Sequence, residues 1–464
     1  MTLRRGLSAI MRWVSLGAFV IVAACQPASP TPTATPPLEP SAQPATASPT
    51  GARAAVSTNE LRGVAIEVWH PWFGVEAGLF ESQAEEFNKI NTWGITVTTT
   101  GRDNYAGLYD SVTASLADGT GPDLAIGLPE YAVDWEARGQ VVDLTAYVGD
   151  PDYGLSSSEV RDFAPVFWSQ DEVAGKRLGI PAERSATFLL YNSSWAEELG
   201  YSAPPKTATQ LRQQACKAHL TFTADSDRAN DAQGGWLITP SSTTFLSWMA
   251  AFGGGVLEGD GYRFLTPKNL EALTFVKQLY DDGCAWGLPA GGDADAAFAG
   301  RQALFGTANL EDLPGVARAV ASASNADQWT VLAFPGTTQS GLAVYGSSYV
   351  VLKSTTQRQL AAWLFVRWML SAENQAKWVE ATGLFPLRSS EMALLTGYEK
   401  SHPQWAAAVG MIPDGSIQPQ LASWREVRVM VGDGFDAMFR SNTPSGRVAE
   451  ILAIMQRAAS DLSK

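Results

Sequence analysis

The pattern of apolar and polar positions predicts alternating strands and helices over the first part of the folded chain. Residues 63–69 form a largely apolar strand, and residues 77–90 place apolar side chains at helical spacings of three and four. An alternating strand at 94–100, a helix at 105–117 and a strand at 124–126 follow. This βαβαβ order predicts a parallel sheet that is covered by helices.

The same alternation continues toward the C-terminus. Strand-like segments lie at residues 176–181, 187–191, 303–305, 329–334 and 349–352. Helical segments start at Trp195 and near Phe245, and lie at residues 208–217, 267–280, 358–370, 372–380 and 447–462. Roughly 400 residues from Asn59 onward exceed what one hydrophobic core usually holds, so we expect two α/β lobes.

The first residues are typical of an export signal. Three arginines precede an apolar stretch at residues 13–24, which is too short to span a bilayer as a permanent helix. The stretch leads into Val22-Ala23-Ala24-Cys25, which resembles a bacterial lipobox. We expect a signal peptide at 1–24 and a lipid on Cys25. The alternative is an ordinary signal peptide in which Cys25 has no role.

Residues 25–58 are rich in Pro, Thr, Ser and Ala and contain almost no large apolar side chain. Such a segment cannot bury enough surface to fold, and its prolines favour an extended conformation. We expect a tether that holds the folded body away from a membrane. No later stretch is apolar for 18 residues, so no second membrane segment is expected.

Charge and cysteines narrow the function classes. The net charge of −14 becomes −17 when the three arginines of the signal are removed, which argues against nucleic acids and anionic membrane surfaces as partners. Besides Cys25, the chain contains Cys216 and Cys284. In an exported protein such a pair favours a disulfide, here worth on the order of 4 kcal/mol. Two free thiols are the alternative.

A set of short motifs follows one another along the body. They are Val68-Trp69, Gly121-Pro122-Asp123-Leu124, Ile180-Pro181, Leu190-Tyr191-Asn192, Pro204-Pro205-Lys206-Thr207, Ala251-Phe252-Gly253-Gly254, Asn269-Leu270-Glu271-Ala272-Leu273, residues 297–303, Phe334-Pro335-Gly336 and Ser371-Ala372-Glu373-Asn374-Gln375. In this order and spacing, the chain resembles the extracellular solute-binding proteins of the maltose-binding type, which serve ABC importers.

The resemblance implies a two-lobed periplasmic-binding-protein fold (type II), an α/β architecture with the ligand in a cleft between discontinuous lobes. It implies an N-terminal lobe of 59–180 and 307–345 and a C-terminal lobe of 181–306 and 346–464. The chain would cross between them near Pro181–Ser185, Phe305–Asn309 and Tyr345–Ser348.

The same resemblance implies a function. We expect a monomer on the outer face of the cytoplasmic membrane that binds a mono- or oligosaccharide. It would deliver this sugar to membrane permease subunits, without a cofactor and without enzymatic activity.

A sugar site needs aromatic platforms beside hydrogen-bonding groups. All tryptophans except Trp13 lie in the body. The aromatic candidates are Trp69, Trp72, Phe73 and Trp424, the last of which matches a stacking position of the family. The polar candidates are Glu130, Glu183, Arg184, Ser185, Ser242, Thr243, Asn309, Tyr345 and Ser347. The competing structural roles are core packing for the aromatics, a Glu183–Arg184 ion pair, and helix capping for the hydroxyls.

Other ligands and an enzyme remain alternatives. Arg184 and Arg425 would suit a glycerol phosphodiester, and Glu130 with Glu183 would suit a polyamine. A glycoside hydrolase with two carboxylates is the alternative from another class, because its acids can lie far apart in the sequence. A calcium loop at residues 225–236 is not expected, because Asn230 and Trp236 occupy the positions that need Gly and Glu. No metal site is predicted.

Overall fold

The computed structural model describes residues 56–463, apart from 338, 441 and 442. The expected signal peptide, Cys25 and nearly all of the tether therefore lie outside the described residues. Within the described residues, no helix is both long and apolar enough to cross a membrane.

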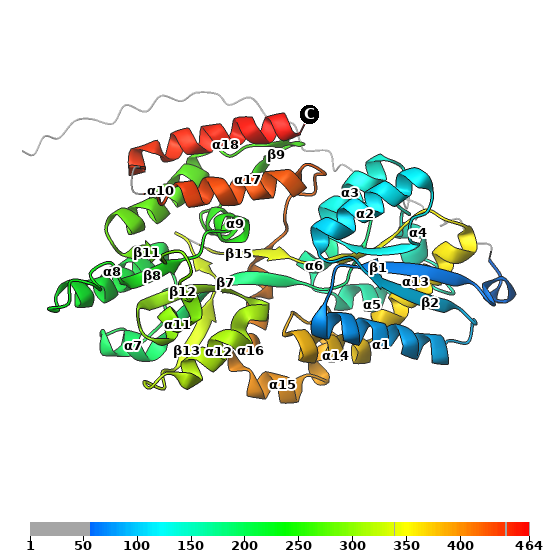
Figure 1. Cartoon of the computed structure of the whole chain (residues 1–464), viewed down its shortest axis with the longest axis horizontal. Coiled ribbons are helices and arrows are strands. Elements are labelled where there is room, and N and C mark those ends of the chain that lie inside the picture. The colour runs from blue at the N-terminus through cyan, green and yellow to red at the C-terminus, as the bar shows by residue number, and fades with distance from the viewer. Residues whose placement is uncertain (1–55, 338, 441–442, 464) are drawn as a thin grey trace, which may run out of the picture. The chain divides into compact units, whose positions relative to one another are not determined.

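The predicted βαβαβ unit is confirmed and forms the first sheet (Figure 1). Strand β1 (Ala65–His70) lies between β2 (Thr96–Gly101) and β3 (Leu124–Gly127), and both pairs are parallel. Helices α1 (Gly74–Ile90) and α2 (Tyr105–Asp118) make the connections. Two antiparallel strands, β16 (Ser348–Val351) and β6 (Ile180–Pro181), complete the order β2-β1-β3-β16-β6.

Helices surround this sheet. Those after the βαβαβ unit are α3 (Pro129–Ala137), α4 (Thr145–Val148), α5 (Ser157–Asp162), α6 (Pro165–Ser169), α13 (Thr356–Met369) and α14 (Ala372–Thr382). A short hairpin of β4 (Glu172–Val173) and β5 (Lys176–Arg177) precedes β6. Helix α13 packs on β1 and β16, and α14 packs on α1. Residues before 182, strand β16 and helices α13 and α14 therefore form one lobe.

The second sheet has the order β11-β8-β12-β7-β15-β14, and β13 and β17 pair with β7 and β15. Its strands are β7 (Ser185–Asn192), β8 (Gly234–Ile238), β11 (Ala285–Gly287), β12 (Ala303–Asn309), β13 (Trp329–Leu332), β14 (Phe334–Pro335), β15 (Ser340–Tyr345) and β17 (Gly415–Ser416). Its helices are α7 (Ser193–Glu198), α8 (Ala208–Thr223), α9 (Ser242–Ala251), α10 (Pro267–Asp281), α11 (Ala294–Ala299), α12 (Leu313–Ser322), α15 (Thr396–Ser401), α16 (Pro403–Val409), α17 (Trp424–Ala437) and α18 (Val448–Leu462), and a hairpin joins β9 (Leu257–Glu258) to β10 (Gly261–Tyr262).

Two chain segments cross from one sheet to the other side by side. Strand β7 pairs with β15 in the second sheet, with Ser185 opposite Tyr345, while β6 pairs with β16 in the first sheet. Between these pairs, the Ala182 amide donates to the Ser347 carbonyl at 3.0 Å. Both crossings were expected at these positions. We call residues 182–185 and 345–348 the crossing segments.

The strand pairing differs from the predicted lobe boundaries at two places. Residues 307–345, expected in the first lobe, contain β13 and β15, which pair with β7 in the second sheet. Strand β16, expected in the second lobe, pairs with β3 in the first. The expected crossing near Phe305–Asn309 is wrong, because β12 pairs with β7 and β8 along this segment. The sequence pattern marks strands but does not say which sheet each one joins.

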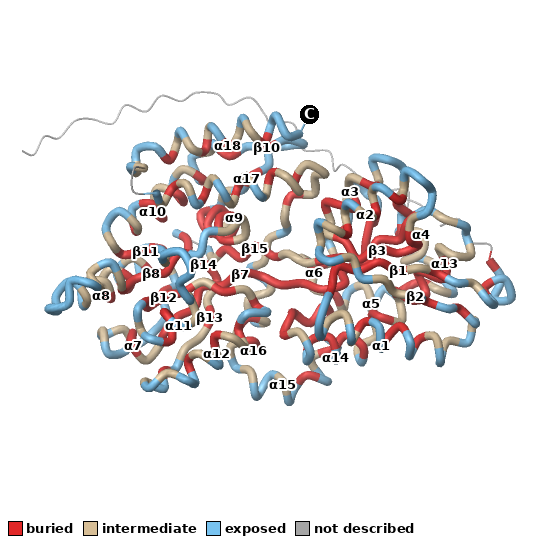
Figure 2. The backbone as a smooth tube through the Cα atoms, viewed as in Figure 1, coloured by how far each residue is buried: buried red, intermediate tan, exposed pale blue. Residues whose placement is uncertain are grey.

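Many of the aromatic side chains are buried in the interior of the two lobes. Figure 2 shows the central strands of both sheets in the buried colour, with exposure on the outer faces of the helices. Trp135, Trp236, Trp248, Trp363 and Trp424 are among the largest fully buried side chains. The predicted disulfide between Cys216 and Cys284 is confirmed, and it ties α8 to the start of β11.

His70 at the end of β1 is 1% exposed, and its ring packs against Trp72 and Phe80. Burial lowers the pKa of this imidazole to about 4. The folded state therefore binds the proton more weakly than the unfolded chain, so stability is lost as pH falls from about 6.5 to about 4. The contribution is about 3 kcal/mol. In urea unfolding across this pH range, the free energy of unfolding should fall less steeply with decreasing pH in His70→Phe than in the wild type. An equal dependence on pH in the two proteins would contradict this account.

Candidate ligand-binding cleft

Two adjoining cavities, of about 260 and 300 Å³, lie beside the crossing segments. They share the lining residues Leu128, Glu311, Tyr345 and Gly346, so they form one cleft. Residues of the second sheet, and of the loops and helices that follow the strands of the first sheet, line this cleft. Its position at the ends of β1, β3 and β7 is where open α/β sheets usually bind ligands.

The apolar wall of the first cavity follows strand β1. Trp72 and Phe73 lie in the loop between β1 and α1, and Leu384 faces them from the segment after α14. The Trp72 ring packs against Trp378 and Phe80, with centroids 4.6 and 5.1 Å away, so its position is fixed. The Phe73 side chain is 75% exposed. Trp72 is only 9% exposed, so it offers the cavity a small, fixed aromatic surface, whereas Phe73 is free to cover a ligand.

Glu183 is the carboxylate at the floor of the first cavity. It is only 9% exposed, and burial raises its pKa. Its Oε1 accepts hydrogen bonds from the Tyr105 hydroxyl at 2.5 Å, Ser347 Oγ at 3.0 Å and Trp72 Nε1 at 3.3 Å. No described residue donates to its Oε2. Three donors from separate segments thus hold one oxygen, while the other is free for a ligand.

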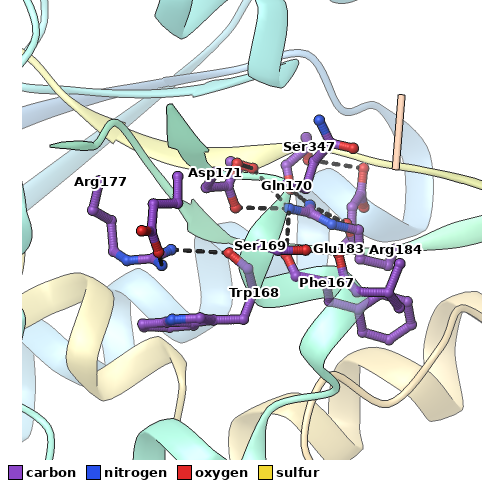
Figure 3. Close-up of polar contacts among 12 residues, drawn as sticks. Phe167, Trp168, Ser169, Gln170, Asp171, Arg177, Glu183, Arg184 and Ser347 are labelled. Atoms are coloured by element: carbon purple, nitrogen blue, oxygen red, sulfur yellow. Dashed lines mark hydrogen bonds and ion pairs between the residues drawn. The ribbon is translucent and has the colours of Figure 1, made fainter. Parts of the chain in front are cut away.

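Arg184 lies beneath this floor, and its guanidinium holds the crossing segments together (Figure 3). Its Nη1 donates to the carbonyls of Ser347 at 2.5 Å and Glu183 at 2.8 Å. Its Nη2 pairs with Asp171 Oδ2 at 2.7 Å, and both side chains are buried. The predicted alternative, an ion pair with Glu183, is not what the side chain forms. Arg184 therefore has a structural role, because it links the two crossing segments.

Glu311 lies where the two cavities meet. It follows β12, and its carboxylate accepts hydrogen bonds from Ser185 Oγ at 2.5 Å and from the Tyr345 hydroxyl at 2.8 Å. Its side chain is open to solvent in the cleft, yet partial desolvation by the cleft walls raises its pKa. The sequence analysis did not select Glu311. Its signal was the position of an acid two residues after Asn309, at a strand end.

The second cavity is more polar. Glu130, at the start of α3, is 5% exposed and lies 3.3 Å from Arg428 Nε, and burial raises its pKa. Thr243 contacts Thr187 Oγ1 at 2.7 Å, and Thr187 donates to Asn309 Oδ1 at 2.8 Å. Ser241 caps helix α9 through the Thr244 amide, which leaves the Ser242 and Thr243 hydroxyls at the cleft wall.

Most of the predicted site residues come together in this cleft. Those on its wall are Trp72, Phe73, Glu130, Glu183, Arg184, Ser185, Ser242, Thr243, Asn309 and Tyr345. Ser347 lies behind the wall, buried, as a donor to Glu183. A ligand contact for each of these remains a prediction. Within the described ranges, no group of three or more His, Cys, Asp or Glu side chains could hold a metal ion.

The structure contradicts the stacking role of two tryptophans. Trp424 is fully buried in the second lobe, where its indole stacks on Tyr262 and its Nε1 donates to Gln418 at 2.8 Å. Trp69 is 6% exposed, and the Arg102 guanidinium covers its ring at 3.6 Å. Both faces of the first sheet are covered by helices, so Trp69 packs inside the lobe. Neither ring reaches the cleft.

Comparisons with known proteins agree with this architecture. A family model described as bacterial extracellular solute-binding protein matches residues 82–411. A binding protein of Brucella abortus (strain 2308) is 22% identical over 335 residues, which are 72% of this chain and 78% of the relative.

Two solved structures share the fold. The sugar-binding protein MalE from Xanthomonas citri has a TM-score of 0.74 at 17% identity, covering 86% of this chain and 97% of that one. UgpB from Mycobacterium tuberculosis in complex with glycerophosphocholine has a TM-score of 0.67 at 16% identity, covering 86% and 98%. The family match spans more than half of the sequence. The chain therefore belongs to the bacterial extracellular solute-binding proteins and has their two-lobed α/β fold.

Proposed function

We propose that this protein captures a carbohydrate in the cleft by closing its lobes and delivers it to the permease of an ABC importer. The observation that carries the proposal is the mixed surface of one cleft. The Trp72 and Phe73 rings lie beside the carboxylates of Glu183 and Glu311 and a set of hydroxyl groups. Sugars present apolar C–H faces and polar edges, and this surface matches both.

The crossing segments are the expected hinge for closure of the two lobes. They connect two separately packed sheets, so a change of their backbone angles would rotate one lobe against the other. Closure would bring Phe73 and the α9 hydroxyls toward the same ligand. The two cavities on either side of Glu311 favour a disaccharide over a single ring. The structural likeness to a sugar-binding protein supports this ligand class.

A phosphodiester ligand is less well supported, although a neighbour of the same fold binds glycerophosphocholine. A phosphate is held best by a free cation beside a helix N-terminus. The N-terminus of α9 lines the second cavity, but the nearby arginines are engaged. Arg184 forms an ion pair with Asp171 and donates hydrogen bonds to two backbone carbonyls, and Arg428 forms an ion pair with Glu130. Arg425, the second predicted cation, pairs with Glu426 and covers the Tyr109 ring.

The lipobox-like sequence supports a further part of the proposal. We infer that Cys25 carries a lipid and that residues 25–58 tether the body to the outer face of the cytoplasmic membrane. The body is then held close to the permease, which raises the effective concentration of the loaded protein there.

The test is thermal unfolding of the body against a panel of neutral sugars, glycerol phosphodiesters and polyamines. A ligand at 100 times its Kd adds about 2.7 kcal/mol to the stability of the folded state, which raises the midpoint by a few degrees. A shift with sugars alone supports the proposal. Shifts with only phosphodiesters or polyamines would replace the ligand class, and release of sugar from a bound oligosaccharide would indicate a hydrolase instead.

Trp72→Ala should lower the affinity for the sugar about 30-fold, because a buried aromatic side chain at a binding site typically contributes 2 kcal/mol or more to the binding free energy. Calorimetric titration measures this directly. Trp424→Phe is the matched control, since that ring lies in the core away from the cleft. Equal losses in both variants would show that the effect comes from folding and not from a stacked ligand.

A further inference from the structure

The charge balance of the first cavity is unusual. Among the described residues, neither Glu183 nor Glu311 forms an ion pair, because the two arginines on the cleft wall are engaged by Asp171 and Glu130. Both carboxylates nevertheless line the same cavity. A carboxylate that is removed from water without a cation is unfavourable, and such unbalanced charges concentrate at functional sites.

The hydrogen bonds show that these carboxylates are held in place without being neutralised. The side chains that donate to them within the described part of the chain carry neutral hydroxyls or an indole N–H, and none of these donates to Glu183 Oε2. Glu183 as a whole is more than nine-tenths buried and lines the cavity, so a ligand there can reach this oxygen. Desolvation, and to a smaller extent the charge of Glu311, raises its pKa.

The aromatic groups of the cavity give a second, independent indication. The Trp72, Phe73, Tyr105 and Tyr345 rings line the same space as the two carboxylates. Aromatic faces attract cations, most strongly when the cation is removed from water. A neutral sugar would use the rings and the carboxylates through its C–H faces and hydroxyls. A cationic group would in addition balance the charge of the carboxylates.

We propose that the carbohydrate bound here carries a protonated amine, which lies between Glu183 and Glu311 against the aromatic wall. This inference rests on the proposed carbohydrate function and names the chemical class of the sugar. The ammonium would donate charge-assisted hydrogen bonds to Glu183 Oε2 and to Glu311, which are roughly twice as strong as bonds between neutral groups. The net negative charge of the chain would also favour the approach of such a cation.

The experiment is calorimetric titration of the body with matched sugars near neutral pH. Glucose, galactose and mannose are each compared with their 2-amino-2-deoxy and N-acetylated forms, and cellobiose with the glucosamine disaccharide. We expect the amine to bind at least tenfold more tightly than either neutral form, and this advantage to shrink as salt is added. Glu183→Gln and Glu311→Gln should each remove most of the advantage of the amine over the neutral sugar, whatever their effect on the affinity for the neutral sugar.

Glu391→Gln is the control. This glutamate is fully buried away from the cleft, and burial raises its pKa to about 8, so its uncharged form resembles glutamine. It should keep the wild-type preference. If the wild type binds the neutral sugars as tightly as the amino sugars, or more tightly, the proposal of a bound amine is wrong and the carbohydrate function stands. Binding of spermidine with no response to any sugar would overturn both. The comparison on the wild type stands even if a variant fails to fold.

Discussion

Replacing Arg184 with methionine is expected to lower the free energy of unfolding by about 3–5 kcal/mol, because it leaves the buried Asp171 carboxylate without a cation. The change also removes the two hydrogen bonds that join the carbonyls of both crossing segments. Urea unfolding measures the loss. Arg138→Met, in an ion pair with Asp134 whose arginine is half exposed, is the control and should lose less than about 1 kcal/mol.

A double variant separates the buried charge from lost packing. Asp171→Asn in the Arg184→Met background removes the unpaired carboxylate, so part of the stability should return. The two substitutions should therefore be strongly non-additive. If their losses simply add, the ion pair is not what stabilises this region.

Gly346→Ala is expected to disturb the cleft and the fold together. Gly346 has φ +145°, and an added Cβ would lie 2.2 Å from the Glu183 carbonyl oxygen. Strain of this kind costs about 1–3 kcal/mol, and relieving it would move the segment that carries Glu183. We expect a lower unfolding midpoint and at least a tenfold loss of ligand affinity, measured by thermal unfolding and calorimetry.

Gly63→Ala provides the comparison. Gly63 also has a positive φ, +80°, but an added Cβ would meet no atom within 4 Å. The free energy of unfolding of Gly63→Ala should be about 1 kcal/mol lower, through backbone strain alone, and its affinity for the ligand should be unchanged. Equal behaviour of the two variants would show that the close approach at Gly346 has no role.

The sequence was informative where local pattern decides the structure. Strands β1 and β3 and helix α2 were predicted within two residues, because buried strands and amphipathic helices leave clear apolar periods. Sheet membership was not predictable in this way. Strand β16 is apolar whichever sheet it joins, and only its pairing with β3 places it in the first lobe.

The candidate site was predicted best at strand ends. Trp72 and Glu130 lie on the cleft wall because they follow the carboxyl ends of β1 and β3, and Ser185 lies there as the first residue of β7. Trp424 was misplaced because its role came from a resemblance. Its own context gives the correct answer: Trp424, Val427, Val431 and Phe435 follow helical spacing and all face the core.

A crystal structure of the body with the sugar that raises its unfolding midpoint most would test the central claim directly. The account predicts that this sugar lies in the cleft, stacked on Trp72, with its polar groups on Glu183 and Glu311 and the lobes closed around it. A sugar bound outside the cleft, or one in the cleft that contacts neither carboxylate, would contradict the account.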